Sequence, residues 1–192
     1  MKFTMYYGFT DNVLSMGIEK ASETALRLGF SSVEMFANLV SGETNSIEDV
    51  KTAKRVRKVL EQYNLPLACY SVYVNLWRNP EGEKELIKQL EIAAELGSPY
   101  FHHTLLPWLT LSDSRPDHQE ALEEAVEAAA RIATYADALG VTCIYEDQGY
   151  YVNGIEGFRG FWEEMKKYSN NIGICGDLGN ILFVNEKPED FH

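Results

Sequence analysis

The chain has 192 residues, of which 45% are hydrophobic, and it carries a formal net charge of -12 with a pI near 4.8. This length and composition allow one sizeable hydrophobic core, so we expect a single domain over residues 1–192. The acidic charge disfavours binding to nucleic acid and to anionic membranes. No segment approaches the roughly 18 apolar residues of a membrane span. We therefore predict a soluble, cytoplasmic protein that binds small molecules.

Hydrophobic periodicity predicts strands and helices in strict alternation. The predicted strands cover residues 3–8, 33–37, 67–74, 100–105, 142–146 and 172–176. The predicted helices cover residues 16–28, 47–63, 81–96, 118–139 and 155–168. Such alternation is typical of a parallel sheet that is built from right-handed crossovers.

Three segments share one plan and form an internal repeat. "ALRLGFSSVEMF", "IAAELGSPYFHH" and "YADALGVTCIYED" each run from an amphipathic helix through Leu-Gly into a short apolar strand. Gly29, Gly97 and Gly140 are therefore predicted to end their helices in the left-handed conformation, which glycine adopts at little cost. The three cysteines lie in apolar runs without CxxC spacing, so we predict buried free thiols.

The arrangement of polar residues favours a barrel over an open sheet. No GxGxxG follows the first strand and no GxxxxGK[ST] occurs, which removes support for a nucleotide-binding sheet. Polar and aromatic residues end strand after strand, as in a (β/α)8 TIM barrel, whose active site gathers at the carboxyl ends of its strands. A complete barrel has eight βα units, whereas this sequence contains about six. We therefore expect an incomplete barrel, either truncated or paired through an exposed edge as a homo-oligomer.

Two carboxylates stand where neighbouring strands end. Glu146 ends the fifth strand in "CIYEDQG", and Asp177 stands at the end of the sixth in "GICGDLGN". In a barrel these side chains would converge, and oxygen ligands of this kind hold Mg²⁺ or Mn²⁺; an added histidine would suit Mn²⁺, Co²⁺ or Zn²⁺. The alternative is that each acid caps the next helix or pairs with a lysine. Asp147 is expected to be exposed or to support the ligands from behind, because neighbouring strand residues face opposite ways.

The histidine pair at the end of the fourth strand can send only one ring into the barrel. When the Leu-Gly repeats are superposed, His103 aligns with Glu146, so His103 is predicted to face inward. It would orient a ligand or bind a substrate oxygen; equally, it could be a structural histidine. Glu34 is a weaker candidate.

Aromatic side chains are dense near the strand ends. The apolar C–H faces of a sugar stack on such rings. Tyr7, Phe9 and Trp108 are the predicted sugar contacts, because Phe9 and Trp108 fall in the loops after the first and fourth strands. The alternative for most of these rings is core packing.

The motifs "YEDQG" and "GDLGN" resemble the fifth-strand Glu motif and the sixth-strand Asp-x-x-His/Asn motif of the sugar phosphate isomerase/epimerase superfamily. This superfamily has a xylose-isomerase-like barrel, and it includes ketose 3-epimerases, inosose dehydratases and nucleases of the endonuclease IV type. The resemblance covers the whole chain as the first six βα units. It implies that Glu146 and Asp177 are two of four metal ligands and that Asn180 replaces a substrate-contacting histidine. The other two ligands, on the seventh and eighth strands, have no counterpart here.

The resemblance implies a divalent-metal-dependent isomerase or epimerase. It would act on a ketose, sugar phosphate or related polyol by proton abstraction next to a carbonyl, through an enediolate, with Glu146 as one acid or base. A second hypothesis is a catalytically incomplete barrel that binds a sugar or serves as an interaction module. A nuclease of the endonuclease IV type is disfavoured, because Asn180 stands in place of a histidine and the chain is acidic.

Overall fold

The computed structural model describes residues 3–40, 47, 49–106, 117–149 and 151–190. Its strands form one parallel sheet in the order β1-β2-β3-β4-β5-β6. The strands are β1 (Thr4–Met5), β2 (Ser32–Asn38), β3 (Leu67–Tyr73), β4 (Tyr100–His103), β5 (Thr142–Glu146) and β6 (Ile172–Cys175). The helices are α1 (Tyr7–Met16), α2 (Ile18–Arg27), α3 (Val50–Gln62), α4 (Pro80–Leu96), α5 (His118–Ala138) and α6 (Ile155–Met165). Two 3-10 helices follow, η1 (Asn180–Val184) and η2 (Pro188–Asp190).

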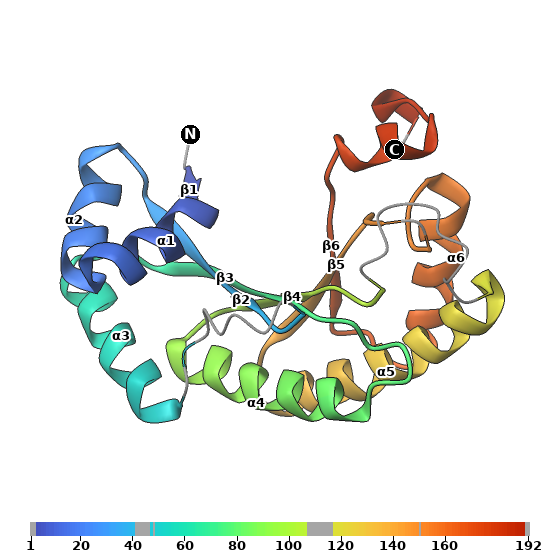
Figure 1. Cartoon of the computed structure of the whole chain (residues 1–192), viewed down its shortest axis with the longest axis horizontal. Coiled ribbons are helices and arrows are strands. Elements are labelled where there is room, and N and C mark those ends of the chain that lie inside the picture. Colours follow the sequence, from blue (N-terminus) through green and yellow to red (C-terminus); the bar gives the residue numbers. More distant parts are fainter. Residues whose placement is uncertain (1–2, 41–46, 48, 107–116, 150, 191–192) are drawn as a thin grey trace.

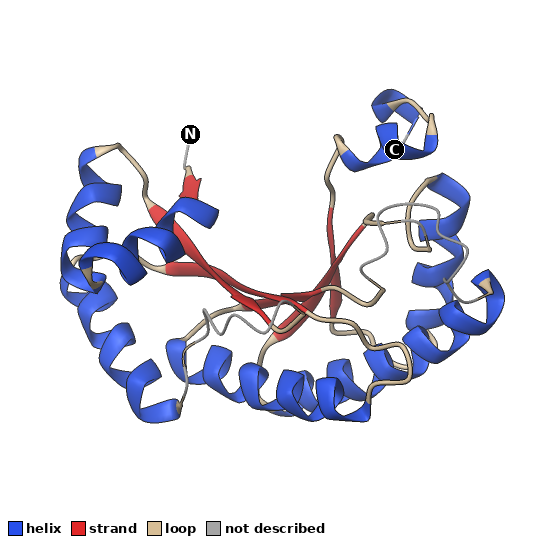
Figure 2. Cartoon of the chain, in the orientation of Figure 1, coloured by secondary structure: helices blue, strands red, loops and turns tan. Residues whose placement is uncertain are grey.

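The sheet is curved, and the helices α3 to α6 lie along its outer side (Figure 1). The edge strands β1 and β6 stand at opposite ends of the curve, and the sheet does not close within the described residues (Figure 2). The chain is thus a partial TIM barrel of about six βα units, as predicted. Its inner face is the concave side of the sheet, toward which the strands send every second side chain.

The glycines that end the repeated helices adopt the predicted conformation. Gly97 has a φ of 77° and Gly140 a φ of 71°, in the left-handed region that glycine occupies at little cost. The amide of Gly97 donates to the carbonyl oxygens of the last turn of α4. These turns end the helix and direct the chain into the next strand, so their position determines where each strand begins.

Aromatic rings on the outer face of the sheet form the centre of the core. Tyr70 and Phe101 are fully buried and stack with ring centroids 6.4 Å apart. Tyr145 meets Phe161 of α6 edge to face at 5.2 Å. The hydroxyl of Tyr70 donates to Oε1 of Gln89 in α4 at 2.8 Å, which satisfies both buried groups. The outer face is therefore closely packed, and polar chemistry is left to the inner face.

The beginning of the chain differs from the prediction. The strand expected over residues 3–8 is limited to Thr4–Met5, and a helix that was not predicted, α1, follows it; the helix expected over 16–28 is α2. Gly17, with a φ of 85°, separates the two helices. Phe9 therefore lies in α1 rather than in a loop, where it is fully buried in the hydrophobic core. An early helix was missed because residues 7–16 combine glycine, threonine and asparagine, which are weak helix formers.

The cysteines are free thiols. Cys69 and Cys143 are buried, as predicted, whereas Cys175 is only partly buried because β6 is an edge strand. In the part of the chain that the structure describes, no helix combines the length and apolar character needed to cross a membrane.

Candidate active site

The register of the sheet decides which side chains share the inner face. Ser71 of β3 pairs with His102 of β4, and Glu146 of β5 pairs with Cys175 of β6. Glu34 of β2 pairs with Cys69, two residues before Ser71, and so projects from the same face. These side chains from five strands therefore share the inner face, and His102, Glu146 and Cys175 stand at the last or next-to-last residue of their strands.

Contacts between these side chains run across four strands. The hydroxyl of Ser71 donates to Oε1 of Glu34. The Oγ atom of Ser71 also lies 3.2 Å from Nδ1 of His102. On the other side of the ring, Nε2 of His102 lies 3.3 Å from Oε2 of Glu146. The side chains of His102 and Glu146 are only 10% and 14% exposed, so water screens this arrangement weakly.

The second oxygen of Glu146 is held by the segment that follows β6. Nδ2 of Asn180 donates to Oε1 of Glu146 at 2.8 Å. A turn brings Asn180 to this position. In the turn, Oδ1 of Asp177 accepts a hydrogen bond from the backbone N–H of Gly179 at 2.8 Å, and the backbone N–H of Asn180 donates to the carbonyl oxygen of Asp177. The amide of Asp177 in turn donates to Oδ1 of Asp147 at 2.9 Å. Both strand-end motifs are thereby joined into one unit.

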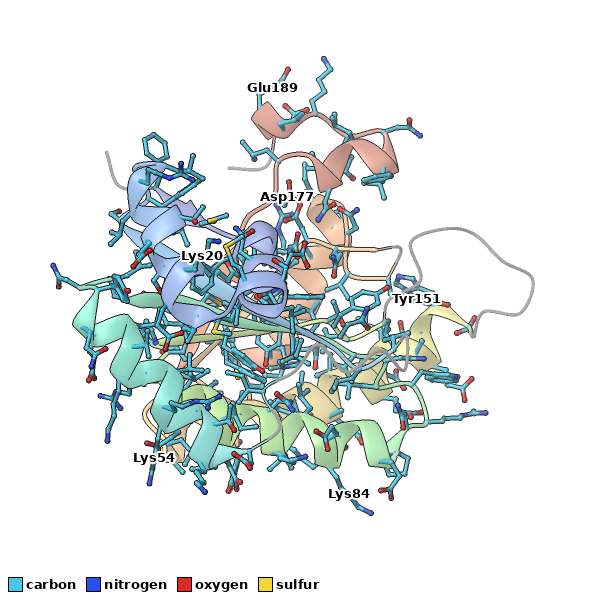
Figure 3. All side chains as sticks on the ribbon, turned by 60° about the vertical axis from the view of Figure 1, so that its left-hand side comes forward. Lys20, Lys54, Lys84, Tyr151, Asp177 and Glu189 are labelled. Carbon is cyan, nitrogen blue, oxygen red and sulfur yellow. The ribbon has the colours of Figure 1, made fainter. Side chains whose placement is uncertain are left out.

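Asp177 itself is exposed at the start of this turn, where β6 leads toward η1 (Figure 3). Asp147 is 1% exposed. It supports the backbone of Asp177 from behind, in agreement with one of the two expectations for this residue. Its other oxygen, Oδ2, is buried without a hydrogen-bond partner among the described residues.

The prediction that His103 faces inward is wrong. His103 is 1% exposed and lies on the outer face, where its ring meets Tyr145 edge to face at 5.3 Å and Phe101 at 5.8 Å. Its Nδ1 lies 3.0 Å from the carbonyl oxygen of Thr104. Burial lowers the pKa of His103 to about 4, so the ring is neutral. It is a structural histidine, and His102 is the residue that faces Glu146.

The error comes from a difference of one residue between the repeats. In β4 two residues, Ser98 and Pro99, separate the helix-ending glycine from the strand, whereas in β5 only Val141 does so. Tyr100 therefore pairs with Thr142, and alignment of the glycines is out of register by one position. A shift of one residue exchanges the two faces of a strand.

The aromatic candidates have different outcomes. Phe9 is 0% exposed in the core, so it is not available to contact a sugar. Tyr7 is the first residue of α1, but its side chain lies outside the described part. Trp108 also lies outside the described residues.

The site is electrostatically negative. The pKa of the Cys175 thiol rises to about 11, first through burial and then through four nearby carboxylates, those of Glu146, Glu34, Asp147 and Asp177. Burial also raises the pKa of Glu34, although the hydrogen bond from Ser71 opposes the rise. Four carboxylates around one thiol would be strongly repulsive in the ionised state, so this end of the sheet favours a cation or a hydrogen-bond donor.

The site offers ligand atoms of the type that divalent metals bind, but few of them. Glu146 and Asp177 supply the oxygen donors that hard cations take, and Mg²⁺ is often held by one or two carboxylates with water completing its shell. Within the described residues, however, no group of three His, Cys, Asp or Glu side chains is placed to hold an ion.

Hollows among the described residues lie both away from this site and beside it. One of about 670 Å³ is lined by α5 residues, including Arg131 and Tyr135, and by Tyr168, on the outer side of the helices. A small cavity of about 10 Å³ lies beside Glu146 at the ends of β4 and β5.

Sequence reasoning missed Ser71 and His102 and gave Glu34 little weight. The sequence signal that could have found two of them is the alternation of side chains along a strand. Cys69 and Ser71 are separated by one buried residue, and so are Glu34 and Phe36. This pattern indicates the face of each side chain, but only the register shows which side chains meet.

Comparison with known proteins places the chain in a family. A search of the curated proteins found no match. Among solved structures, a D-psicose 3-epimerase crystallised with D-fructose aligns over 97% of this chain and 67% of its own, with a TM-score of 0.75 and 18% identity. The probable 3-DHS dehydratase of petrobactin synthesis from Bacillus anthracis aligns over 100% and 68%, with a TM-score of 0.75 and 13% identity.

A third structure, the D-psicose 3-epimerase with D-tagatose from Clostridium cellulolyticum H10, aligns over 95% of this chain and 65% of its own, with a TM-score of 0.73 and 16% identity. The chain thus spans about two thirds of the length of these structures. At such identities the likeness shows the fold alone. The model of the xylose isomerase-like TIM barrel family matches residues 22–191. The chain belongs to the xylose isomerase-like TIM barrel family.

Proposed function

We propose that the chain catalyses proton transfer at the carbon beside the carbonyl group of a ketose, a sugar phosphate or a related polyol, as an isomerase or epimerase. The observation that carries the proposal is the carboxylate of Glu146, fixed at the carboxyl end of β5 between Asn180 and His102. Structures of the same fold include epimerases with D-fructose and D-tagatose. A fixed carboxylate in a weakly solvated position is the group that such a reaction needs as a base.

Glu146 acts as the base in this proposal. One carboxylate oxygen takes the proton from the substrate carbon, the C–H electron pair forms the new C=C bond, and the carbonyl oxygen becomes an enediolate oxygen. Delivery of a proton to the opposite face of the enediolate, by a second acid on that side, gives an epimer. Return of the proton by Glu146 to the former carbonyl carbon, with transfer of the hydroxyl proton from one substrate oxygen to the other, gives an isomer. The hydrogen bond from Asn180 keeps Oε1 in place while Glu146 takes or returns a proton.

Glu146 and Asp177 would hold a divalent cation, for which Mn²⁺, Mg²⁺, Co²⁺ and Zn²⁺ are the candidates. When bound, the ion would supply Lewis acidity to the substrate oxygens. Asn180 is also placed to donate to a substrate oxygen with its remaining N–H, and His102 replaces His103 as the histidine of the site. The cytoplasmic location and a homo-oligomeric state remain predictions.

The test is deuterium exchange in D₂O. The purified chain would be incubated with Mg²⁺ or Mn²⁺ and with D-fructose, D-tagatose, D-psicose or their phosphates, and the sugars examined by mass spectrometry. We expect one deuterium to enter beside the carbonyl, whatever the stereochemical outcome. Glu146→Gln should abolish incorporation and keep the fold, because Gln retains the acceptor for Asn180. The exposed Glu163→Gln is the matched control. Incorporation by Glu146→Gln at the wild-type rate would refute the proposal.

A binding protein without catalysis is the second candidate. It is favoured by the lack of a three-ligand metal group among the described residues. It would show saturable sugar binding, for example by calorimetry, but no deuterium uptake in the presence of Mg²⁺ or Mn²⁺.

A further inference from the structure

Two neighbouring hollows on the outer side of the helices form a groove along α5. The first, of about 670 Å³, includes Ala130, Thr134 and Ala138, which stand one turn apart on α5. The second, of about 490 Å³, lies between α5 and α6. Both are lined by Glu127 and by Tyr168, which is 56% exposed, so they belong to one depression, the α5 groove. Small side chains in a line along α5 leave room for the side chains of a second helix.

The groove carries negative charge that its own surroundings do not neutralise. Glu123 and Glu127 are exposed, stand four residues apart on α5, and take part in no ion pair within the described residues. Arg131, one turn further along α5, is held instead by Glu83 of α4, through Nε at 2.7 Å and Nη2 at 2.9 Å. No lysine or arginine of the described chain lines the second hollow. The groove therefore fits a helix that presents cations beside apolar surface.

The chain itself contains such a helix, α3. Five of the 17 lysines and arginines of the chain lie close together in α3: Lys51, Lys54, Arg55, Arg57 and Lys58. Of these, Lys51, Arg55 and Lys58 are exposed, make no ion pair within the described residues, and share one stripe of the helix by their spacing. Lys51 and Arg55 are four residues apart, as are the two free carboxylates of the groove. Two helices that lie along one another can therefore form both ion pairs, while the alkyl stems of the cations cover the apolar floor.

The basic helix and the acidic groove of one copy cannot meet. α4 lies between α3 and α5 along the outer side of the sheet and packs against both (Figure 1). The helix α3 can therefore reach an α5 groove only in another copy of the chain. Because the helix and the groove are different surfaces, such a contact joins copies head to tail.

We propose that copies of this chain associate through α3 of one copy and the α5 groove of the next, with Lys51 and Arg55 facing Glu123 and Glu127. The contact does not depend on the proposed function, because both surfaces lie on the outer side of the sheet, away from its inner face. The net charge of -12 opposes the approach of two copies. The association is therefore reversible and rises with protein concentration.

The experiment is sedimentation velocity of the full chain over about a hundredfold range of protein concentration. It is done at physiological salt, where the Debye length of about 8 Å limits the repulsion between distant charges. The wild type should sediment faster as its concentration rises. Lys51→Glu/Arg55→Glu and Glu123→Lys/Glu127→Lys should each stay monomeric, because helix and groove then carry like charges. The chain with all four substitutions should associate again, because its charges are exchanged and opposite charges meet once more.

Lys84→Glu/Lys88→Glu is the matched control. It reverses two exposed cations that are four residues apart on α4, and it changes the net charge as much as the α3 variant does. This control should associate like the wild type, and its loss of association would overturn the proposal in favour of an effect of net charge. A wild type that is monomeric at every concentration would also overturn it and leave the groove to a basic helix of another protein. Association that survives either reversal, or that the fourfold variant fails to recover, would assign the contact to another surface, such as the open edges of the sheet.

Discussion

The side-chain amide nitrogen of Asn180, Nδ2, lies 2.8 Å from Oε1 of Glu146, so the segment after β6 fixes the carboxylate at the end of β5. Two motifs that are more than thirty residues apart in the sequence thus act as one unit. The backbone link from Asp177 to Asp147 joins them a second time. The position of Glu146 therefore depends on both strand ends rather than on its own loop.

Removal of the side-chain amide of Asn180 should lower the catalytic rate strongly and the free energy of unfolding only slightly. A hydrogen bond to a charged group contributes about 1.5–3 kcal/mol, so Asn180→Ala should lower the rate of deuterium exchange about tenfold to a hundredfold. The side chain is only partly buried, and the urea midpoint should change little. An exchange rate equal to that of the wild type would show that Asn180 does not hold the reacting carboxylate.

A divalent ion should bind through Glu146 and Asp177. The double variant Glu146→Gln/Asp177→Asn should lose the Mn²⁺ that the wild type retains after desalting, as measured by elemental analysis. The control is Glu163→Gln/Asp137→Asn, which makes the same charge change at exposed positions. If both double variants lose metal equally, the ion is attracted only by the net charge of -12 and not by a site.

Asp147 should make stability depend on pH. Burial raises the pKa of its carboxyl above 3.8, while the backbone amide of Asp177 opposes the rise and the charges of Glu146 and Asp177 add to it. The folded state then binds the proton more tightly than the unfolded state. The stability that this group contributes is fully present below pH 3.8 and is lost as the pH rises through the folded-state pKa.

Asp147→Asn cannot ionise but keeps an oxygen for the amide of Asp177. Its stability relative to the wild type should therefore rise with pH and then level off. Urea midpoints at several pH values from about 4 to 8 would measure the trend. Asp137→Asn, at an exposed position on α5, serves as the reference. A stability difference that is independent of pH would contradict the raised pKa.

Two glycines should respond in opposite directions to the same substitution. A Cβ at Gly140 or at Gly160 would meet no atom within 4 Å, so packing does not decide either case. Gly140 has a φ of 71°, where alanine costs about 1–2 kcal/mol. Gly160 lies inside α6, where alanine is better than glycine by about 1 kcal/mol. Thermal or urea unfolding should show Gly140→Ala less stable and Gly160→Ala more stable than the wild type; a change of the same sign in both would contradict this explanation.

The sequence by itself determined the order of the βα units, the left-handed glycines and the position of Glu146 and Asp177 at strand ends. These features depend on local periodicity and on backbone freedom at single residues, both of which can be read from a short segment. The parallel sheet follows from the same alternation of strand and helix. For this reason the bounds of β2, β3 and β5 differ from the predicted ranges by a single residue at each end at most.

Only the tertiary structure decided which side chains meet. His102, not His103, faces Glu146, because a linker that is one residue longer before β4 exchanges the faces of that strand. Glu34 and Ser71 join the site because β2, β3 and β4 are neighbours in register, and Phe9 leaves it because α1 packs its ring into the core. A strand alternates its side chains with a period of two, so local sequence shows that two faces exist. The pairing with neighbouring strands determines which face is the inner one.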